Sequence, residues 1–561
     1  MSNSENRVTF NRREAFFLAA AGGIGAALAR PAFASDSTKT TAHQEPGFCS
    51  TPKTAVANTQ YGKVRGFVSG DVFTFKGVPY GQDTGGENRW LPAKPPTPWT
   101  GEYPALIYGA NCPQHIHDNS GLEQSFLQDW DDGYMNEDML KLNIWTPSLT
   151  GKLPVMFYIH GGGFLLGSAY ELPSHEGAQM ARHHDVVQVS VNHRLNILGF
   201  FDVSEVGGSA YEDSSNVGMT DLVAALEWVR DNISNFGGDP NRVLIYGQSG
   251  GGTKVSTLLG MPSAKGLVHR AVMQSGGGGD LPTAEETKEY TRQLIKEMGI
   301  GPHDISSLQK MEWPKMMDAV TSLAGKSKSK GLTLDLPFFP IPAYVLTRFW
   351  GPTLDGRLIT MKSFEDAAPE ITKDVPVMIG SVSEEGCAYA SNPTEAEWHA
   401  GLAKFYGETK AAALIAAMKK AHPEKSIRTL SYGVAGLNSR TNVARMAKMK
   451  YDLHGAPVYT YFFSWQTPML DGPGAWHTAD LAFCFDNTLR CAQGTGNTPE
   501  AQVLAKKMAT AWATFARTGN PSQPGLTWEP SDPVRNQTMV WDNNCSMVDD
   551  PEGEARKILL S

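Results

Sequence analysis

The sequence lacks an excess of positive charge and, after its N-terminal segment, any long apolar run. The apolar N-terminal run, residues 15–29, is shorter than the roughly 20 residues that a membrane-spanning helix needs. With 49 Lys and Arg against 58 Asp and Glu, the formal net charge is −9. An acidic surface disfavours nucleic acid and anionic membranes as partners. We therefore expect neither partner once the N-terminal segment is removed, and the sequence leaves the oligomeric state open.

Residue spacings typical of a metal site are also missing. His183-His184-Asp185 is a cluster of potential ligands, but no Cys or His spacing around it supports a bound metal. A polar helix end is the simpler interpretation of these three residues. The sequence therefore predicts no metal site.

The most informative segment that is present is Gly247-Gln248-Ser249-Gly250-Gly251. It matches G-x-S-x-G, the turn that presents a nucleophilic serine between a strand and a helix. The flanking residues agree, because 242–246 predict a buried strand and 253–260 predict a helix. Glycines let the strand and helix approach closely and let the serine adopt a strained backbone. An ordinary glycine-rich turn is the alternative interpretation of this motif alone.

A second glycine motif, His160-Gly161-Gly162-Gly163-Phe164, precedes the first in the chain. It follows an apolar run, Leu153–Ile159, that predicts a strand. Acyl transfer needs backbone N–H groups aimed at one oxyanion, and glycines let the backbone come close enough. A tight glycine turn is the alternative, but the order of the two motifs favours an oxyanion hole.

Further segments occur in an order that resembles the type-B carboxylesterase/cholinesterase family. They extend from about Thr59 to about Trp541 and include residues 75–80, 136–145, 192–194, 198–200, 236–240, 274–276 and 515–521. The resemblance implies an α/β-hydrolase fold, with a central, mostly parallel, twisted sheet flanked by helices. It also implies that residues 35–561 form a single domain, with helical insertions at about 281–344 and 392–455 that form a cap and the walls of a substrate gorge.

The resemblance also implies a catalytic triad. Ser249 would be the nucleophile, Glu385 the acid in the segment 383–386, and His477 the base in the segment 474–480. This chain order is the one found in α/β-hydrolases. Histidine titrates near pH 6.5, so its neutral form is available as a base, and a carboxylate fixes its tautomer. The oxyanion hole would use the backbone N–H groups of Gly162, Gly163 and Gly250, and the chemistry requires no metal or organic cofactor.

Four positions depart from the family pattern. Gln248 replaces a glutamate beside the nucleophile, and Gly250 replaces an alanine, which we expect to leave the N–H in place on a less constrained backbone. Glu384 stands where the family has aspartate and is interpreted as structural. Asp480 replaces a glutamate that is one methylene longer. None of these changes removes a group that the reaction requires.

The expected function is that of a serine carboxylesterase acting on neutral, moderately hydrophobic esters. Hydrolysis of a carbamate, amide or lactone by the same triad is an alternative. A catalytically silent binding module of this fold is a second alternative, which the presence of the complete triad disfavours. The natural ester cannot be named from the sequence.

The N-terminus resembles a twin-arginine export signal. Arg12 and Arg13 precede the apolar run, and Ala32-Phe33-Ala34 offers a cleavage site before Ser35. We therefore expect residues 1–34 to be removed from a periplasmic or secreted bacterial protein. Twin-arginine substrates fold in a reducing compartment, where disulfides are rare.

The cysteines agree with this route. Exported relatives pair a cysteine at the position of Cys112 with one at the position that Met139 occupies here. Cys112 therefore has no partner by this comparison, and we favour free thiols at Cys484 and Cys491, although their spacing allows a bridge. The acidic segment between Cys112 and Met139 is interpreted as a solvated loop, or alternatively as a gorge rim that repels anions.

Overall fold

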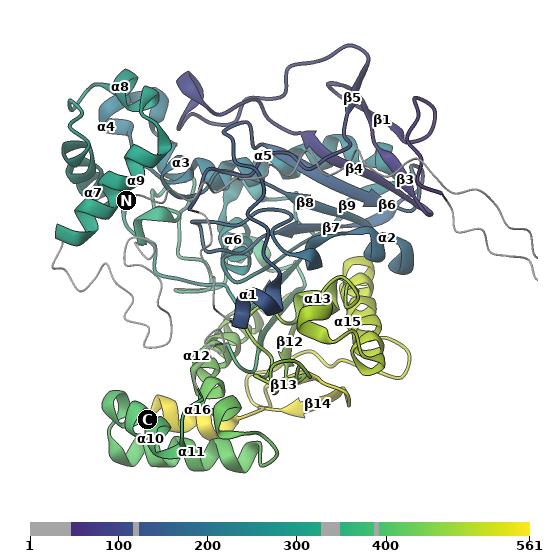
Figure 1. Ribbon diagram of the computed structural model, residues 1–561, viewed down its shortest axis with the longest axis vertical. Helices are drawn as coiled ribbons and strands as arrows, with labels where there is room; N and C mark the ends of the chain where they lie inside the picture. Colours follow the sequence, from purple (N-terminus) through teal and green to yellow (C-terminus); the bar gives the residue numbers. More distant parts are fainter. Residues whose placement is uncertain (1–46, 116–122, 327–347, 386–391) are drawn as a thin grey trace, which may run out of the picture. The chain divides into compact units, whose positions relative to one another are not determined.

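A mixed sheet of 11 strands organises the protein, in the order β14-β13-β12-β11-β10-β9-β7-β8-β6-β4-β3 (Figure 1). The pairings from β13 through β8 are parallel, and those at the two ends of the sheet are antiparallel. The strands are β3 (Phe67–Ser69), β4 (Val72–Pro79), β6 (Lys141–Thr146), β7 (Leu153–Ile159), β8 (Val187–Val191), β9 (Gly238–Gln248), β10 (Arg270–Gln274), β11 (Val377–Val382), β12 (Val458–Phe463), β13 (Gln537–Trp541) and β14 (Ser546–Asp549).

This computed structural model describes residues 47–115, 123–326, 348–385 and 392–561. The export signal predicted for residues 1–34 lies outside the described residues. The described chain also contains a small sheet, β1 (Val56–Thr59), β2 (Gly62–Arg65) and β5 (Glu102–Pro104), in the order β1-β2-β5.

Both faces of the central strands are buried, as parallel sheets covered by helices require. Alternate residues of β7 show the two faces. Phe157 packs in one apolar cluster with α5 (Val217–Asn232) and α6 (Gly250–Gly260), and Tyr158 packs in another with α15 (Pro499–Thr518). Because side chains alternate along a strand, a continuous apolar run serves both layers. The sheet therefore lies between two helical layers.

The segment at 281–344 contains helices where it is described. They are α7 (Ala284–Glu297), α8 (Ile305–Lys310) and α9 (Trp313–Lys326). Thr283 begins α7 with a capping box, since its hydroxyl accepts from the Glu286 N–H and the Glu286 carboxylate accepts from Thr283. The rest of this segment, from residue 327, lies outside the described residues.

The segment at 392–455 is also helical. It contains α10 (Glu395–Tyr406), α11 (Glu408–Ala421) and α12 (Ile427–Tyr451), and α16 (Gly553–Leu560) packs against α11 and α12. These helices share an apolar cluster of their own, which includes Trp398, Leu414 and Leu437. The long helix α12 joins this cluster to the sheet, because it also packs on β11 and β12.

Short helices fill the connections between these elements. They are α1 (Glu123–Gln128), α2 (Ala178–His184), α3 (Asn196–Gly199), α4 (Ser204–Gly207), α13 (Leu481–Cys484) and α14 (Ala492–Thr495). No helix of the described residues is both long enough and apolar enough to cross a bilayer.

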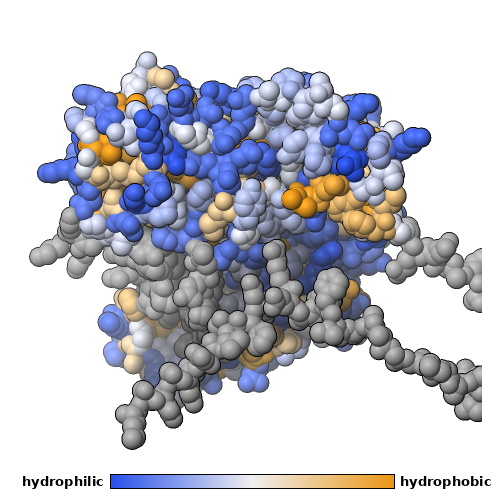
Figure 2. Space-filling view, turned by 45° about the horizontal axis from the view of Figure 1, so that its top comes forward, coloured by the Kyte–Doolittle hydropathy of each residue, from blue (hydrophilic) through white to orange (hydrophobic). Residues whose placement is uncertain are grey.

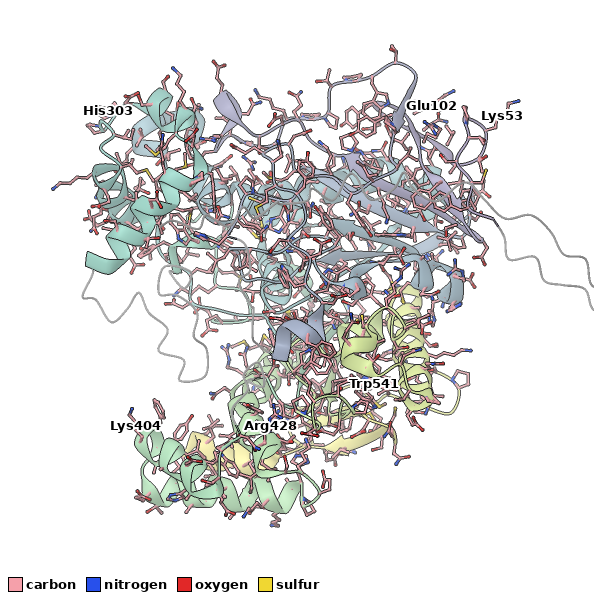
Figure 3. The ribbon with its side chains drawn as sticks, in the orientation of Figure 1. Lys53, Glu102, His303, Lys404, Arg428 and Trp541 are labelled. Carbon is pink, nitrogen blue, oxygen red and sulfur yellow. The ribbon has the colours of Figure 1, made fainter. Side chains whose placement is uncertain are left out.

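The surface is mainly hydrophilic, with small separate hydrophobic patches on the face seen in Figure 2. Charged side chains such as Lys53, His303 and Lys404 lie at the periphery in Figure 3, whereas Trp541 is fully buried. The cysteines at 49, 112, 484, 491 and 545 are free thiols, and Cys112, Cys484 and Cys491 are buried. The thiols of Cys484 and Cys491 are therefore not bridged in the structure.

Candidate active site

Ser249 occupies a strained turn between β9 and α6. Its backbone angles are φ 58° and ψ −126°, in a region that residues with a side chain rarely adopt. The Ser249 N–H donates to the carbonyl of Gln274 at the end of the neighbouring strand β10, at 2.7 Å. That bond fixes the turn to the sheet, so the strain is held by the surrounding structure.

The expectation that the helix begins at Thr253 is wrong, because α6 begins directly after Ser249, at Gly250. The glycines are required by packing rather than by helix propensity. A Cβ at Gly251 would lie 2.2 Å from the carbonyl oxygen of Ile159, and one at Gly247 would lie 2.5 Å from the same atom. The end of β7 and the start of α6 therefore approach more closely than any side chain permits.

The second glycine motif lies against the start of α6. Gly162 and Gly163 have φ of 72° and 64°, which favour glycine. A Cβ at Gly250 would lie 2.3 Å from the Cα of Gly163. The sequence suggested only that Gly250 makes the backbone less constrained. In the structure, Gly250 also allows the two predicted halves of the oxyanion hole to touch.

The N–H groups of this region are available. Among the described residues, none accepts a hydrogen bond from the N–H of Gly162 or Gly163. Gly250 is the first residue of α6, where the N–H has no partner within the helix. The three N–H groups predicted from the sequence can thus bind an anion or an oxyanion.

Glu385 and His477 lie together, although 92 residues separate them. His477 Nδ1 donates to the Glu385 carboxylate, which leaves Nε2 as the acceptor of the neutral ring. Burial lowers the pKa of His477, but the Glu385 charge offsets this effect, and the pKa is raised above its ordinary value. The imidazole side chain is 25% exposed, so a small molecule can reach it.

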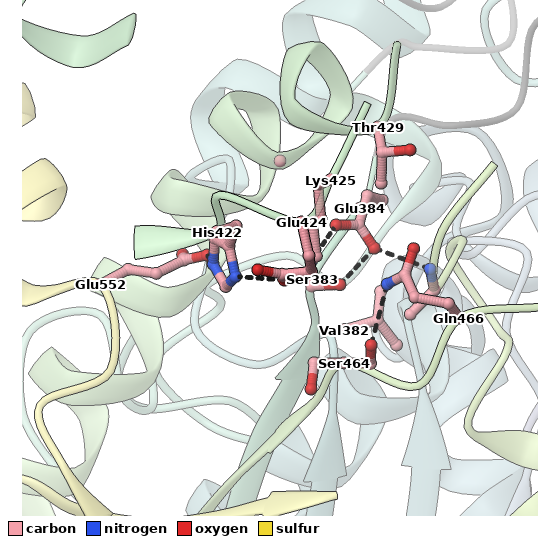
Figure 4. A network of polar contacts seen from close by, with 12 residues as sticks. Val382, Ser383, Glu384, His422, Glu424, Lys425, Thr429, Ser464, Gln466 and Glu552 are labelled. Atoms are coloured by element: carbon pink, nitrogen blue, oxygen red, sulfur yellow. Dashed lines mark hydrogen bonds and ion pairs between the residues drawn. The ribbon is translucent and has the colours of Figure 1, made fainter. Parts of the chain in front are cut away.

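Glu384, the residue before Glu385, makes several polar contacts, including one with Lys425 (Figure 4). Its carboxylate accepts from the Ala475 N–H at 2.7 Å and pairs with the Lys425 ammonium, also at 2.7 Å. The Glu384 N–H donates to the Ala475 carbonyl at 3.1 Å. The structural interpretation of Glu384 agrees with these contacts, and they explain how distant segments meet.

The Ser249 hydroxyl is not hydrogen-bonded to His477 among the described residues. The side-chain amide nitrogen of Gln248 instead lies 3.1 Å from His477 Nε2 and 3.4 Å from Nδ1, so it packs against the ring rather than in line with one nitrogen. Gln248 is buried beside the serine. The structure therefore joins Glu385 to His477 and places Ser249 next to this pair, with the Gln248 amide against the imidazole ring.

Asp480 stabilises the structure around this site and does not take part in the predicted chemistry. Its carboxylate accepts from the Tyr461 hydroxyl at 2.7 Å and from the Gln274 amide at 2.9 Å. Burial raises the pKa of Asp480 above its ordinary value. These bonds connect the start of α13 to β12 and β10, so the shorter side chain still has local partners.

The remaining polar clusters form ion pairs. His183 and His184 both face Asp486, and no group of three potential ligands among the described residues could hold a metal. In the acidic segment before Met139, Glu137 pairs with Arg89 and Asp138 pairs with Lys141. Part of this segment is thus bound to the fold rather than only solvated, and residues 116–122 lie outside the described residues.

Comparison with known proteins decides the family. The model of the carboxylesterase family matches residues 53–557. The chain belongs to the carboxylesterase family. It is a carboxylic-ester hydrolase, and the α/β-hydrolase fold predicted from the sequence is confirmed.

Curated relatives and solved structures agree with this assignment. The carboxylesterase is 31% identical to the para-nitrobenzyl esterase of Bacillus subtilis, over 90% of this chain and 98% of that protein. It is also 31% identical to the phenmedipham hydrolase of Pseudarthrobacter oxydans, over 85% and 94%. An esterase of Clostridium hathewayi that can hydrolyse aliphatic aromatic polyesters superposes with a TM-score of 0.78, at 32% identity, over 91% of this chain and 99% of that one.

Two contacts at the site were not predicted from the sequence. The contact of Gln248 with His477 could not be foreseen, because it depends on a side-chain direction. Lys254 is fully buried in α6, where its ammonium group contacts the oxyanion loop, defined here as residues 160–164. The available signal was a single lysine among the small and apolar residues that follow Ser249.

Proposed function

We propose that this carboxylesterase hydrolyses neutral, moderately hydrophobic esters through an acyl-enzyme on Ser249, with His477 as the base and Glu385 as its orienting acid. The observation that carries the proposal is the Glu385–His477 pair beside a serine on a strained turn. An isolated histidine or serine would not support it. Together they match the nucleophile, base and orienting group that covalent catalysis needs.

In the first step, Ser249 Oγ attacks the ester carbonyl carbon, and its proton passes to His477 Nε2. The negative charge on the carbonyl oxygen is held by the N–H groups of Gly162, Gly163 and Gly250. His477 then gives the proton to the leaving alcohol as the C–O bond breaks. In the second step, water attacks the acyl-enzyme, its proton passes through His477 to Ser249, and the carboxylic acid leaves.

Before this proton transfer, the Ser249 hydroxyl must come within hydrogen-bond distance of His477 Nε2. Catalytic hydrogen bonds are often loose without substrate and tighten in the complex. The Gln248 amide nitrogen, 3.1 Å from Nε2 and 3.4 Å from Nδ1, packs against the ring and leaves the Nε2 lone pair for the serine. This contact also keeps the ring in place until the substrate arrives.

The preference for neutral esters rests on the side chains beside Ser249. A quaternary ammonium substrate gains from a nearby negative charge and from aromatic faces. Gln248 provides an amide where a carboxylate would provide charge.

Replacement of the nucleophile tests the proposal. Ser249→Ala should abolish turnover of p-nitrophenyl butyrate while the thermal unfolding transition is retained. Ser256→Ala is the matched control, because Ser256 lies on the same helix and its hydroxyl donates to the Thr253 carbonyl instead. Retention of more than a few per cent of activity in pure Ser249→Ala protein would refute the assignment.

We further propose export with removal of residues 1–34. The basis is the sequence pattern around Arg12 and Arg13 and the unpaired cysteines. N-terminal sequencing of the mature protein from the producing cells should begin at Ser35. A mature chain that still begins before Arg12 would contradict the signal.

A further inference from the structure

Lys254 has an unusual place beneath the oxyanion loop. It lies on α6, five residues after Ser249, and is 0% exposed. Its ammonium group donates to the carbonyl oxygens of His160 at 3.0 Å and Gly161 at 3.2 Å. Both carbonyls belong to the loop whose next residues are Gly162 and Gly163. Lys254 therefore contacts backbone carbonyls of the oxyanion loop and not the predicted catalytic side chains.

The surroundings do not explain the lysine as part of an ion pair. Among the ion pairs of the described residues, none includes Lys254. The face of the Phe164 ring lies 5.6 Å away, and the charge of Glu171 also acts on the lysine. Burial lowers the pKa of Lys254 to about 7, so the amine is only partly protonated near neutral pH. Both its protonated and its neutral form carry enough N–H groups to donate to the two carbonyls, and a buried polar group is costly unless it is hydrogen-bonded in this way.

Peptide planarity gives these contacts a consequence. The carbonyl of Gly161 and the N–H of Gly162 belong to one planar, trans peptide unit, in which the two bonds point in opposite directions. A donor that fixes the Gly161 carbonyl therefore also fixes the direction of the Gly162 N–H. Gly162 and Gly163 lack a Cβ, so sterics alone restrict this stretch little. The Gly162 carbonyl accepts from the N–H groups of Leu165 and Leu166, and Lys254 supplies the corresponding contact for the preceding peptide.

We propose that Lys254 is a positioning residue for the oxyanion hole. By holding the carbonyls of His160 and Gly161, it directs the Gly162 N–H toward the acyl oxygen of the ester. This inference rests on the proposed function of that loop. It predicts that loss of the ammonium group weakens stabilisation of the transition state and leaves binding of the ester ground state nearly unchanged.

The chain offers a closely matched control. Lys450 on α12 is also 0% exposed and donates to two successive backbone carbonyls, those of Thr372 at 2.9 Å and Lys373 at 2.8 Å. These carbonyls precede β11 and belong to neither the turn at Ser249 nor the oxyanion loop. Lys450→Met therefore reproduces the loss of a buried, carbonyl-bound lysine without affecting the proposed site.

The test compares Lys254→Met with Lys450→Met in p-nitrophenyl butyrate hydrolysis and in inhibition by a trifluoromethyl ketone, whose Ser249 adduct carries an oxyanion. Loss of one oxyanion donor costs about 10²–10³ in turnover, so misdirected donors should cost Lys254→Met at least about tenfold in kcat. KM should change less than about threefold, and inhibitor affinity should fall in parallel with kcat/KM. Lys450→Met should lose thermal stability but keep kcat and inhibitor affinity.

Equal kcat values for the two folded variants, or a loss that appears only in KM, would overturn the role of Lys254. If the Met variant does not fold, Lys254→Gln against Lys450→Gln carries the same comparison. Wild type and Ser249→Ala are measured alongside. An inactive wild type or an active Ser249→Ala would overturn the proposed function, whereas expected behaviour of both with unaffected Lys254 variants would overturn only this inference.

Discussion

His477 contacts a carboxylate and an amide, and the carboxylate affects its protonation. The Glu385 charge raises the pKa of His477 above its ordinary value despite the lowering by burial. In the proposed mechanism, only the neutral ring can accept the Ser249 proton. Activity should therefore rise with pH through a midpoint higher than that of a typical histidine, near 6.5.

Glu385→Gln should move this acid limb to lower pH, because the charge that raises the pKa is lost. It should also lower kcat by about three to four orders of magnitude, as changes that disturb the histidine tautomer do. The measurement is the pH profile of kcat/KM for p-nitrophenyl butyrate. An acid limb that does not move would contradict the pairing of these two residues.

Gly250 is the second residue for which the structure gives a sharp expectation. A Cβ there would meet the Cα of Gly163 at 2.3 Å and its N at 2.5 Å, and backbone atoms cannot rotate away. The family pattern has alanine at this position, so the prediction concerns the close packing found in this chain: Gly250→Ala should push the oxyanion loop aside and reduce kcat by about 10–100-fold, less than the full loss of a donor. Steady-state kinetics at constant pH measure this effect.

Gly401→Ala is the control for Gly250→Ala. Gly401 lies inside α10, where an added Cβ meets nothing within 4 Å. It should leave kcat unchanged and stabilise the helix by about 0.5–1 kcal/mol. An equal kcat for both variants would show that the oxyanion loop shifts without loss of function.

The sequence could predict Ser249, the glycines of both motifs and the positions of Glu385 and His477, because short motifs and family resemblance identify residues by order. It could not predict the place of Lys254 beneath the oxyanion loop or the contact of Gln248 with His477. Their importance depends on distances across the fold, 3.0 Å to a carbonyl and 3.1 Å to an imidazole, and no local pattern specifies these.

At the scale of elements, Glu384 joins the end of β11 to the segment before α13. It is 1% exposed, and Lys425, its partner, is also buried. Glu384→Gln would leave a buried ammonium without its counter-charge, which costs about 3–5 kcal/mol. We expect a marked fall in the melting temperature and a much smaller loss of kcat than in Glu385→Gln.

Glu554→Gln provides the comparison for Glu384→Gln. Glu554 pairs with Lys420 at 2.7 Å, but both side chains are exposed, and such pairs contribute about 0–1 kcal/mol. Thermal melts and kcat of the two variants should therefore separate clearly. If Glu384→Gln lost as much kcat as Glu385→Gln at full folding, the acid would be assigned to the wrong glutamate.

The sequence predicted the bounds of some strands and helices more accurately than those of others. The strand expected at Leu153–Ile159 matches β7, because a continuous apolar run of seven residues has a clear start and end. The start of α6 was placed three residues too late, since glycines argue against a helix by propensity. Tertiary packing at Gly250 and Gly251 overrides that propensity, and only the neighbouring strand reveals it.

For the whole molecule, the acidic balance of the chain raises the question of substrate charge. Two acids of the segment before Met139 are neutralised by Arg89 and Lys141, and charges beyond about 8 Å are screened at physiological salt. A quaternary ammonium group also lacks a carboxylate next to Ser249, where Gln248 lies. Butyrylcholine should therefore have no advantage in kcat/KM over 3,3-dimethylbutyl butyrate, its uncharged analogue.

The comparison should be made at physiological ionic strength and repeated at low salt. At low salt, an advantage for the choline ester would reflect faster encounter with an acidic molecule. A clear advantage at physiological salt would instead contradict the proposed preference. Cation–π contacts alone could supply about 0.5–2 kcal/mol, so the measurement must resolve a few-fold difference.

Glu384 and Trp476 form an isolated β-bridge, and this pairing affects how activity is regained during refolding. It joins chain segments on either side of the helices α10, α11 and α12, so it can form only after a long loop has closed. Non-local contacts of this kind form slowly compared with helices. Ester turnover should thus return later than the helical signal after dilution from denaturant. The return of activity marks completion of the whole fold, whereas the helical signal marks formation of the individual helices.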